Sequence, residues 1–285
     1  MPELPEVETI KQDLKERIVN KQITSVLLSK KAIIKNKRTD FIKEIKNNKF
    51  TDILRIGKLI IFVLASKKYM LVHLKMTGQL IYQQGKDIIA GGHPEPDLEK
   101  LPNKFTRIIF EFKNGSKLYF NDIRRFGYMQ IVDEVGLNEI KNKFGLEPID
   151  KKFTFEYFQK IFENKNKPIK VALMDQDKIA GIGNIYASEI CFEAKIKPAR
   201  KAKNLSIKEL KALYLASKKV LQVAIKNRGT TFSDYVDATG HAGYNISFLK
   251  VYDRKGMKCK RRDGGIINKI ILGGRGSFYC PKCQK

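Results

Sequence analysis

The first residues of the chain carry groups that could do nucleophilic chemistry. An initiator methionine before a small residue is usually removed, and its removal would leave Pro2 as a free secondary amine beside Glu3. An α-amino group titrates near about 8, whereas a lysine titrates near about 10.4, so a terminal amine is a usable nucleophile at neutral pH. The same residues also suit a helix start, with Pro5 at its first position and Glu6 and Glu8 at the positive end of the helix dipole. Taken alone, the helix start explains the segment without any catalytic role.

Other polar side chains stand where turns are expected. Lys58 follows a glycine at the start of an apolar strand, and a solvated lysine at a sheet edge is its ordinary explanation. Arg124 and Arg125 could hold phosphate or bases, although a surface ion pair is the usual fate of a single arginine. Asn184 follows two glycines between two helical patterns, so it can cap the second helix at an end that suits a phosphate.

The cysteines near the end of the chain have part of a metal-binding pattern. Cys280 and Cys283 form a C-x-x-C pair, which is half of a zinc ribbon. The other half has Cys259 and then Arg262, and an arginine cannot ligate zinc. Cys191 lies in a helical pattern and is interpreted as a buried thiol. The sequence thus supplies three cysteine ligands, one fewer than a structural zinc site normally has.

The elements that must position these groups fall into two halves. Apolar spacing predicts a helix from Val7 to Ile18, and the segment from Gln83 to Asn103 is expected to be a long exposed loop. Asn114-Gly115 is a hairpin signal. Many short strands and few helices indicate a β-sandwich or open barrel. The expected strands are Ile23–Leu28, Thr51–Ile56, Leu59–Leu64, Met70–Lys75, Arg107–Phe112 and Lys117–Phe120.

The second half has a helical pattern. Helices are expected over Ile169–Asp177 and Ile185–Ala194, and a third is expected to start at a Ser206 capping box and to stop near Gly229. A β-like run covers Ile266–Leu272. The loop-rich stretch between Gly229 and this run is either a mobile lid or a linker.

Composition restricts the possible partners. The 285 residues suggest two or three domains, and a net charge of +26 points to a polyanion, since cations that neutralise phosphates release counterions. Membrane surfaces are the competing anion, but no apolar run is long enough to span a bilayer and no signal peptide pattern is present. With only four cysteines, the chain is expected to be a soluble cytosolic protein.

Six segments together resemble one known family. In order along the chain they read PELPEVET, HLKMTG, NDIRRFG, AGIGNIYASE, GTTFSDYVDATG and GGRGSFYCPKCQ. This set is similar to the bacterial formamidopyrimidine-DNA glycosylases, and the resemblance covers essentially the whole chain. Relatives of the endonuclease eight type typically begin PEGPE, so Leu4 favours the formamidopyrimidine branch.

The resemblance implies an α+β multidomain fold. It comprises an N-terminal β-sandwich with a long N-terminal helix, a helix-two-turn-helix module and a C-terminal zinc-ribbon-like β-hairpin finger. The implied domains are residues 1–131 for the catalytic sandwich, 132–150 for a linker, 151–228 for the DNA-binding module, 229–245 for a lesion-capping loop and 246–285 for the finger.

The resemblance also implies a base-excision-repair enzyme that is both a glycosylase and an abasic-site lyase. It would remove oxidised purines, namely formamidopyrimidines and oxidised guanine, through a Schiff base on Pro2 followed by β,δ-elimination. Glu3 matches the acid that protonates the opening sugar, Lys58 the proton donor of β-elimination and Arg275 the finger residue of δ-elimination. No organic cofactor is implied.

The implied partner is damaged double-stranded DNA, bound by a monomer in the bacterial cytoplasm at the nucleoid, with no membrane role. Met76, Arg124 and Phe126 match residues that fill the gap left by a flipped base. Lys165 and Asn184 match DNA-binding and phosphate-binding positions. The stretch from 230 to 244 matches the loop that closes over the extruded base.

Two departures from the family stand out. Phe105 occupies the place of a family histidine that contacts DNA, and Arg107 is expected to replace part of that contact. In the finger, Cys259 and Cys280 lie one residue further apart than in relatives. Either Asp263 or water completes a three-cysteine zinc site, or the hairpin folds without metal, and the donor count argues against zinc.

Two other functions compete with the glycosylase and lyase. One is a catalytically idle DNA-binding protein, which the presence of Pro2, Glu3, Lys58 and Arg275 disfavours. The other is an enzyme for oxidised pyrimidines, which Leu4 disfavours.

Overall fold

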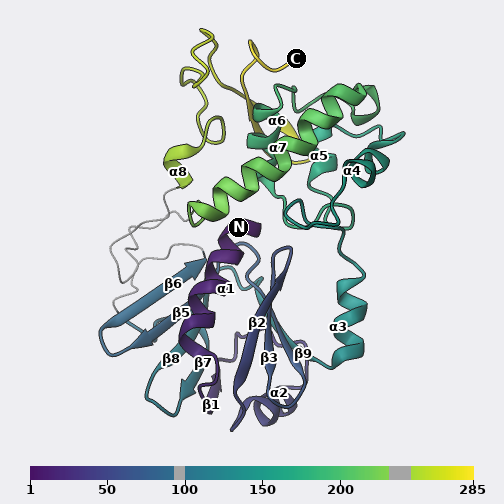
Figure 1. The fold of residues 1–285 in the computed structure, drawn as a ribbon. Helices are drawn as coiled ribbons and strands as arrows, with labels where there is room; N and C mark the ends of the chain where they lie inside the picture. Colours follow the sequence, from purple (N-terminus) through teal and green to yellow (C-terminus); the bar gives the residue numbers. More distant parts are fainter. Residues whose placement is uncertain (93–99, 231–244) are drawn as a thin grey trace. The chain divides into compact units, whose positions relative to one another are not determined.

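The structure is a computed structural model that describes residues 1–92, 100–230 and 245–285 (Figure 1). The chain divides into two compact units. The first unit comprises Met1–Lys143 with Asn227–Ile246, and the second comprises Phe144–Lys226 with Ser247–Lys285. The loop predicted to close over an extruded base lies outside the described residues, apart from its ends.

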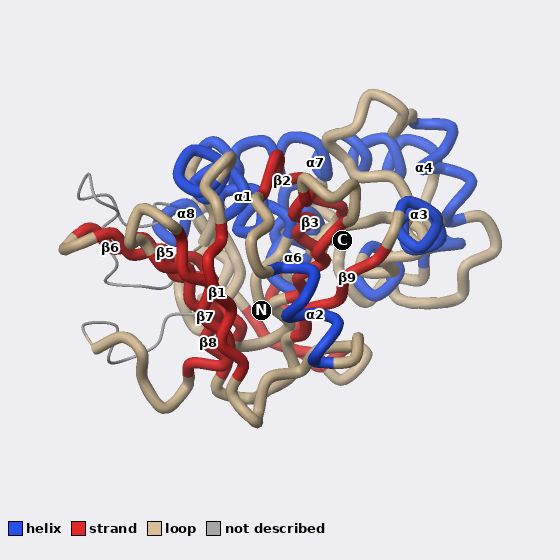
Figure 2. Tube along the Cα trace, turned by 90° about the horizontal axis from the view of Figure 1, so that it is seen from below, coloured by secondary structure: helices blue, strands red, loops and turns tan. Residues whose placement is uncertain are grey.

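The first unit contains two antiparallel sheets, so the predicted β-sandwich is confirmed. Figure 2 shows β1, β7 and β8 side by side and β2, β3 and β9 in a second group. The five-stranded sheet has the order β1 (Ile23–Leu28), β7 (Thr106–Phe112), β8 (Lys117–Asp122), β5 (Gly78–Gln84) and β6 (Asp87–Gly92). The four-stranded sheet has the order β2 (Phe50–Ile56), β3 (Leu59–Leu64), β4 (Tyr69–His73) and β9 (Tyr128–Val132).

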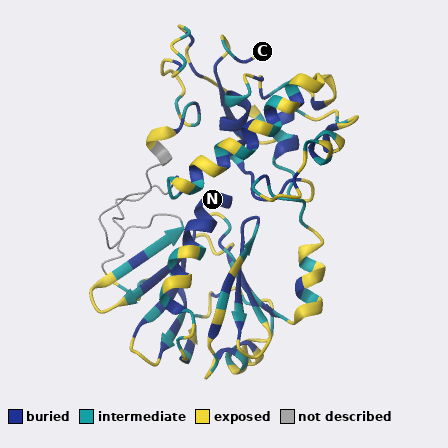
Figure 3. Ribbon diagram, in the orientation of Figure 1, coloured by how far each residue is buried: buried dark blue, intermediate teal, exposed yellow. Residues whose placement is uncertain are grey.

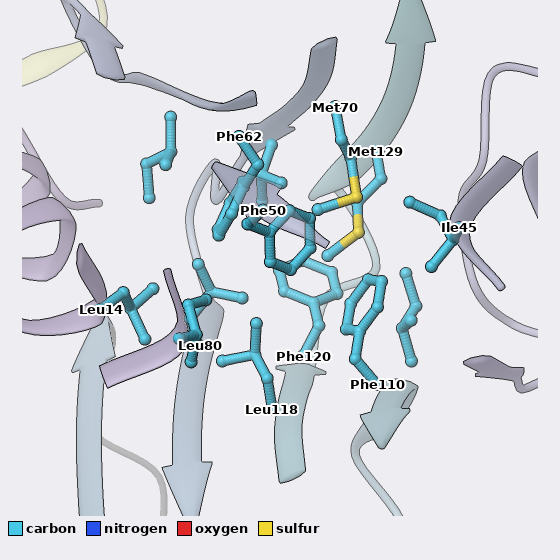
Figure 4. Close-up of a cluster of buried hydrophobic side chains, with 14 of the residues drawn as sticks. Leu14, Ile45, Phe50, Phe62, Met70, Leu80, Phe110, Leu118, Phe120 and Met129 are labelled. Carbon is cyan, nitrogen blue, oxygen red and sulfur yellow. The ribbon is translucent and has the colours of Figure 1, made fainter. Parts of the chain in front are cut away.

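Aromatic and branched side chains from both sheets fill the sandwich (Figure 4). The rings of Phe50 and Phe62 lie 4.8 Å apart between centroids, and Phe50 also meets Phe110 edge-on at 6.2 Å. All three side chains are fully buried. Burial of this size, worth about 1.5–3 kcal/mol for each such side chain, fixes the strands on which the site residues stand.

Three helices accompany the sheets: α1 (Leu4–Ile18), α2 (Arg38–Ile45) and α3 (Glu134–Lys141). The predicted first helix is confirmed, with Val7, Ile10, Leu14 and Ile18 all buried. Figure 3 shows that burial is continuous in the first turns of α1 and then becomes one-sided. The helix therefore begins in a buried environment, where two of its glutamates also lie.

The prediction of a long loop between Gln83 and Asn103 is wrong in part. Gln83 and Gln84 end β5, and β6 follows after a two-residue turn in which Gly85 has a φ of +59°. Strand β6 is short and carries three small residues near its end, so it gives little periodic signal. The sequence also lacked a clear sign of β9 and α2.

The second unit is helical, as predicted. Its helices are α4 (Phe155–Phe162), α5 (Ile169–Leu173), α6 (Asn184–Glu193) and α7 (Ile207–Lys226), with a short 3-10 turn at Ala202–Asn204. The capping box of α7 is confirmed, because Ser206 N–H donates to Glu209 Oε2 at 2.8 Å and Glu209 N–H donates to Ser206 Oγ at 3.3 Å. Helix α5 ends earlier than expected, at Leu173.

A two-stranded hairpin completes the second unit, formed by β10 (Asn268–Leu272) and β11 (Arg275–Tyr279). Its turn is Gly273-Gly274, with φ values of +54° and +72°, which explains why two glycines stand there. No helix in the described part of the chain is long and apolar enough to cross a bilayer.

Candidate active site and metal centre

The start of α1 is held by a buried carboxylate. Glu3 N–H donates to Glu6 Oε2 at 2.9 Å, while Glu6 Oε1 accepts from the Thr230 N–H at 2.7 Å and from its hydroxyl at 3.0 Å. Gly229 allows this approach, since its φ is +78° and a Cβ there would lie 2.8 Å from Glu6 Oε1. Glu6 thus joins the N-terminal turn to the start of the predicted capping loop. Sequence reasoning assigned Glu6 only to the helix dipole, and nothing local pointed to Thr230.

Lys58 lies in the tight turn between β2 and β3, with only 6% of its surface exposed. The interpretation of Lys58 as a solvated lysine at a sheet edge is therefore wrong. Pro2 is buried and Glu3 is 2% exposed. Burial lowers the pKa of the chain's α-amino group at Met1, the charges of Glu3 and Glu6 raise it, and Lys58 lowers it further. The first unit thus brings the terminal amine, an acid and a lysine into one electrostatic neighbourhood.

A second cluster lies where two loops of the same unit meet. The buried carboxylate of Asp122 accepts from the Thr77 hydroxyl at 2.5 Å and from Gly127 N–H at 2.8 Å, and Thr77 Oγ1 accepts from Arg124 N–H at 3.0 Å. This network holds the loop after β4 beside the loop after β8. It therefore brings Met76 together with Arg124 and Phe126.

The three side chains on these loops are presented to solvent. Met76 is 38% exposed and Phe126 is 50% exposed. The Arg124 guanidinium stacks on the Phe126 ring, 4.7 Å from its centroid. Apolar and cationic groups in one exposed cluster are of the kind that can stack on bases.

Arg107 does not have the position expected of a phosphate contact. It is 7% exposed, and it donates from Nε to the Asp122 carbonyl at 2.9 Å and from Nη1 to the Lys104 carbonyl at 2.8 Å. The expectation that Arg107 replaces the family histidine is therefore wrong, because its guanidinium is used to hold the loop around Asp122. Phe105 itself is half-buried, with Lys104 Nζ 5.0 Å from its ring centroid.

In the second unit a buried lysine that the sequence reasoning missed organises the polar residues. Lys170 is fully buried, and its Nζ donates to Asn184 Oδ1 at 2.5 Å, Gly276 O at 2.9 Å and Ser277 Oγ at 2.8 Å. The ammonium thus joins the first residue of α6 to β11. Asn184 is the first residue of α6, and the N-cap of this helix is Gly183, so the expectation that Asn184 caps the helix is wrong. A polar residue in an otherwise apolar helix pattern was the only available signal for Lys170.

Lys165 and Arg275 line one hollow of about 450 Å³ in the second unit, together with Lys167, Met174 and Asp175. Arg275 is exposed at the first position of β11, and its Nη1 lies 3.8 Å from Met174 Sδ. Three cations, Lys165, Lys167 and Arg275, thus line this hollow. The larger hollow of the first unit, about 730 Å³ and lined by residues such as Asn36 and Lys68, contains none of the predicted site residues.

A group of four metal-binding side chains lies at the base of the hairpin. The ligand atoms of Cys259, Asp263, Cys280 and Cys283 all lie within 4.8 Å of one another. A carboxylate therefore supplies the fourth donor whose absence argued against zinc. Cys191 lies elsewhere, fully buried, and burial raises its pKa to about 12, as an inert core thiol requires.

Comparisons with known proteins agree with this arrangement. The family model described as the formamidopyrimidine-DNA glycosylase N-terminal domain matches residues 1–129, and the model described as its H2TH domain matches residues 144–236. The formamidopyrimidine-DNA glycosylase of Pelotomaculum thermopropionicum is 39% identical over all of this chain and 99% of its own length. That of Mycoplasma genitalium is 36% identical over all of this chain and 96% of its own length.

Solved structures show the same likeness. A variant of the Lactococcus lactis enzyme in complex with DNA containing Fapy-dG has a TM-score of 0.88 and 30% identity, with full coverage of both chains. The complex of the Lactococcus lactis enzyme with abasic-site DNA has a TM-score of 0.87 at 30% identity, over 99% of each chain. The fold and these comparisons together define a DNA-repair glycosylase. Within that class, the chain belongs to the formamidopyrimidine-DNA glycosylase family.

Proposed function

We propose that this enzyme excises oxidised purines from double-stranded DNA and then cuts the strand as an abasic-site lyase. The observation that carries the proposal is the burial of Pro2, Glu3 and Lys58 in the first unit, where the charges of Glu3 and Lys58 both act on the terminal amine. Burial lowers the pKa of the terminal amine at Met1, and the Pro2 amine freed by removal of Met1 would have to be unprotonated in the same way to attack carbon. The solved relatives in complex with Fapy-dG and abasic-site DNA support the substrate class.

The proposed reaction begins with removal of Met1, which frees the Pro2 nitrogen. Attack of this nitrogen on the sugar C1′ breaks the bond to the base, which leaves with the bonding electrons and takes up a proton. Glu3 protonates the sugar ring oxygen as the ring opens, and an iminium forms between Pro2 and C1′. The iminium acidifies the C2′ proton, whose loss expels the 3′ phosphate with proton transfer by Lys58. A second elimination, assigned to Arg275, expels the 5′ phosphate, and water then releases Pro2.

The DNA-binding residues have separate proposed roles. Met76, Arg124 and Phe126 form the exposed cluster that would enter the duplex where the damaged base is flipped out. Lys165 and Asn184 would bind phosphates. Cys259, Cys280 and Cys283 would be ligands of a structural zinc at the base of the hairpin that carries Arg275.

Borohydride trapping tests the catalytic proposal. The mature protein, incubated with a duplex that contains oxidised guanine opposite cytosine, should form a reduced covalent adduct. The matched control is the same chain with Met1 retained, in which the Pro2 nitrogen is an amide and no adduct should form. Failure of the mature protein to form an adduct would refute the enzyme reading in favour of an idle DNA-binding protein. A stronger adduct with an oxidised pyrimidine would move the enzyme to the other branch of the family.

A further inference from the structure

We infer that Asp263 is the fourth ligand of a zinc site, so that the finger holds its metal with three thiolates and one carboxylate. The other ligands are Cys259, Cys280 and Cys283. The site would replace the four-cysteine arrangement that the resemblance implies. This inference concerns metal binding alone, and it stands or falls independently of the proposed reaction on DNA.

The chain between Cys259 and Asp263 is folded so as to return the carboxylate to the cysteines. Arg262 has a φ of +56° and Gly264 has a φ of +76°, so the backbone turns sharply on both sides of Asp263. Arg262 N–H donates to Cys259 O at 3.0 Å, and Cys259 N–H donates to Gly265 O at 2.8 Å. These two turns therefore place the Asp263 carboxylate, and not the Arg262 side chain, among the cysteine sulfurs.

The distances between donor atoms agree with tetrahedral zinc. Bonds of about 2.3 Å to sulfur and about 2.0 Å to a carboxylate oxygen require about 3.8 Å between two sulfurs and about 3.5 Å between sulfur and oxygen. The observed separations are 4.0 Å between Cys259 Sγ and Cys283 Sγ and 3.6 Å between Cys280 Sγ and Asp263 Oδ2. Both pairs thus stand within a few tenths of an ångström of the required spacing.

The carboxylate is oriented as a ligand by its surroundings. Its Oδ1 accepts the Gly265 N–H at 2.7 Å, which leaves Oδ2 as the oxygen nearer to Cys280 Sγ. A Cβ at Gly265 would lie 2.5 Å from that sulfur, so the glycine keeps the space beside the donors open. Outer hydrogen bonds of this kind set the direction of metal ligands.

Nearby groups also stabilise the charge of such a site. Three thiolates and one carboxylate carry four negative charges, and a divalent zinc leaves two, as in a four-cysteine site. Arg261 donates from its backbone N–H to Cys259 Sγ at 3.4 Å and from Nη1 to Cys283 Sγ at 3.3 Å. Its guanidinium is held in place by the Phe192 ring, 4.0 Å from the centroid. The guanidinium against Cys283 Sγ and the backbone N–H against Cys259 Sγ offset part of the remaining charge.

Metal binding to the full-length chain tests the inference. Zinc is measured per chain in the purified protein, and Co²⁺ is then titrated into the protein after chelation. The test variant is Asp263→Asn, which keeps an oxygen to accept the Gly265 N–H and loses only the anionic ligand. The matched control is Asp253→Asn, an exposed position in the same segment. Wild type and control should bind one metal each, and Asp263→Asn should weaken Co²⁺ affinity by at least about 10-fold.

A gain-of-ligand variant makes the test independent of any loss of folding. In Asp263→Cys, four thiolates replace three, so the sulfur-to-cobalt charge-transfer absorption should rise by about one third. An unchanged spectrum in Asp263→Cys would overturn the inference. So would wild-type affinity and spectrum in Asp263→Asn, which would make water the fourth ligand. Absence of metal binding in the wild type would show that the hairpin folds without metal.

Discussion

His73 should make the enzyme lose stability as the pH falls below neutral. This residue ends β4, and burial lowers its pKa to about 3, with further lowering by the charges of Lys75, Lys58 and Lys35. Its Nδ1 accepts the Lys75 N–H at 3.0 Å, which requires the unprotonated nitrogen. The native protein therefore holds a neutral imidazole, while the unfolded chain takes up a proton near the ordinary pKa of 6.5.

The direction and size of the effect follow from proton linkage. Between pH about 6.5 and about 3 the unfolded state binds more protons than the native state, so the free energy of unfolding rises with pH. The stability due to neutral His73 is fully present above the unfolded pKa and is lost as the pH falls through this window. At pH about 5.5, one unit below the unfolded pKa, the loss is RT ln 11, or about 1.4 kcal/mol.

Urea unfolding at pH about 7.5 and about 5.5 measures this loss, with tyrosine fluorescence as the signal because the chain has no tryptophan. His73→Asn supplies the reference, since its amide oxygen can accept the Lys75 N–H and does not titrate. The wild type should lose about 1.4 kcal/mol more than the variant on acidification. Equal losses in the two proteins would refute a neutral buried imidazole, and a smaller loss in the wild type would reverse the reasoning.

Two further substitutions test contacts at the candidate site. Lys170→Met should lower the free energy of unfolding by about 1–3 kcal/mol in a thermal melt, because Asn184 Oδ1 and Gly276 O lose a buried donor; an unchanged melting temperature would count against this role. Gly229→Ala should destabilise more than Gly115→Ala in the same assay, although both have φ near +79°, since only the first Cβ meets Glu6. Equal effects, each of about 1–3 kcal/mol, would mean that backbone strain alone explains both.

Much of the fold could be predicted because its signals are local. The strand pair around Asn114-Gly115 has both its apolar strand residues and its turn within a few consecutive residues. The capping box of α7 is likewise complete within Ser206 to Glu209. Strand β6 carries no such signal, because its small residues near the end give little contrast between the two faces of the sheet.

The site depends on contacts that no local pattern contains. Glu6 meets Thr230 across 224 residues, and Lys170 meets Ser277 across 107. Lys58 looked like a solvated lysine, since its neighbours in the chain specify a turn but not what covers it. Residue type and resemblance could therefore nominate Glu3 and Lys58. Their burial, and the burial that lowers the pKa of the Met1 amine, required the folded chain.

The finger shows why counting residues fails where the backbone turns sharply. Counting a second C-x-x-C pair from Cys259 presumes that its loop has the same conformation as the loop between Cys280 and Cys283. Under that presumption Arg262 occupies the donor position. With positive φ at Arg262 and Gly264, the backbone turns so that the side chain after Arg262 faces the cysteines. A donor missing from the cysteine spacing is thus present in space as Asp263, one of the alternatives that the sequence had left open. The substitution of oxygen for sulfur predicts a site with the same formal charge as four cysteines but one fewer thiolate, which is the difference that the cobalt spectrum measures.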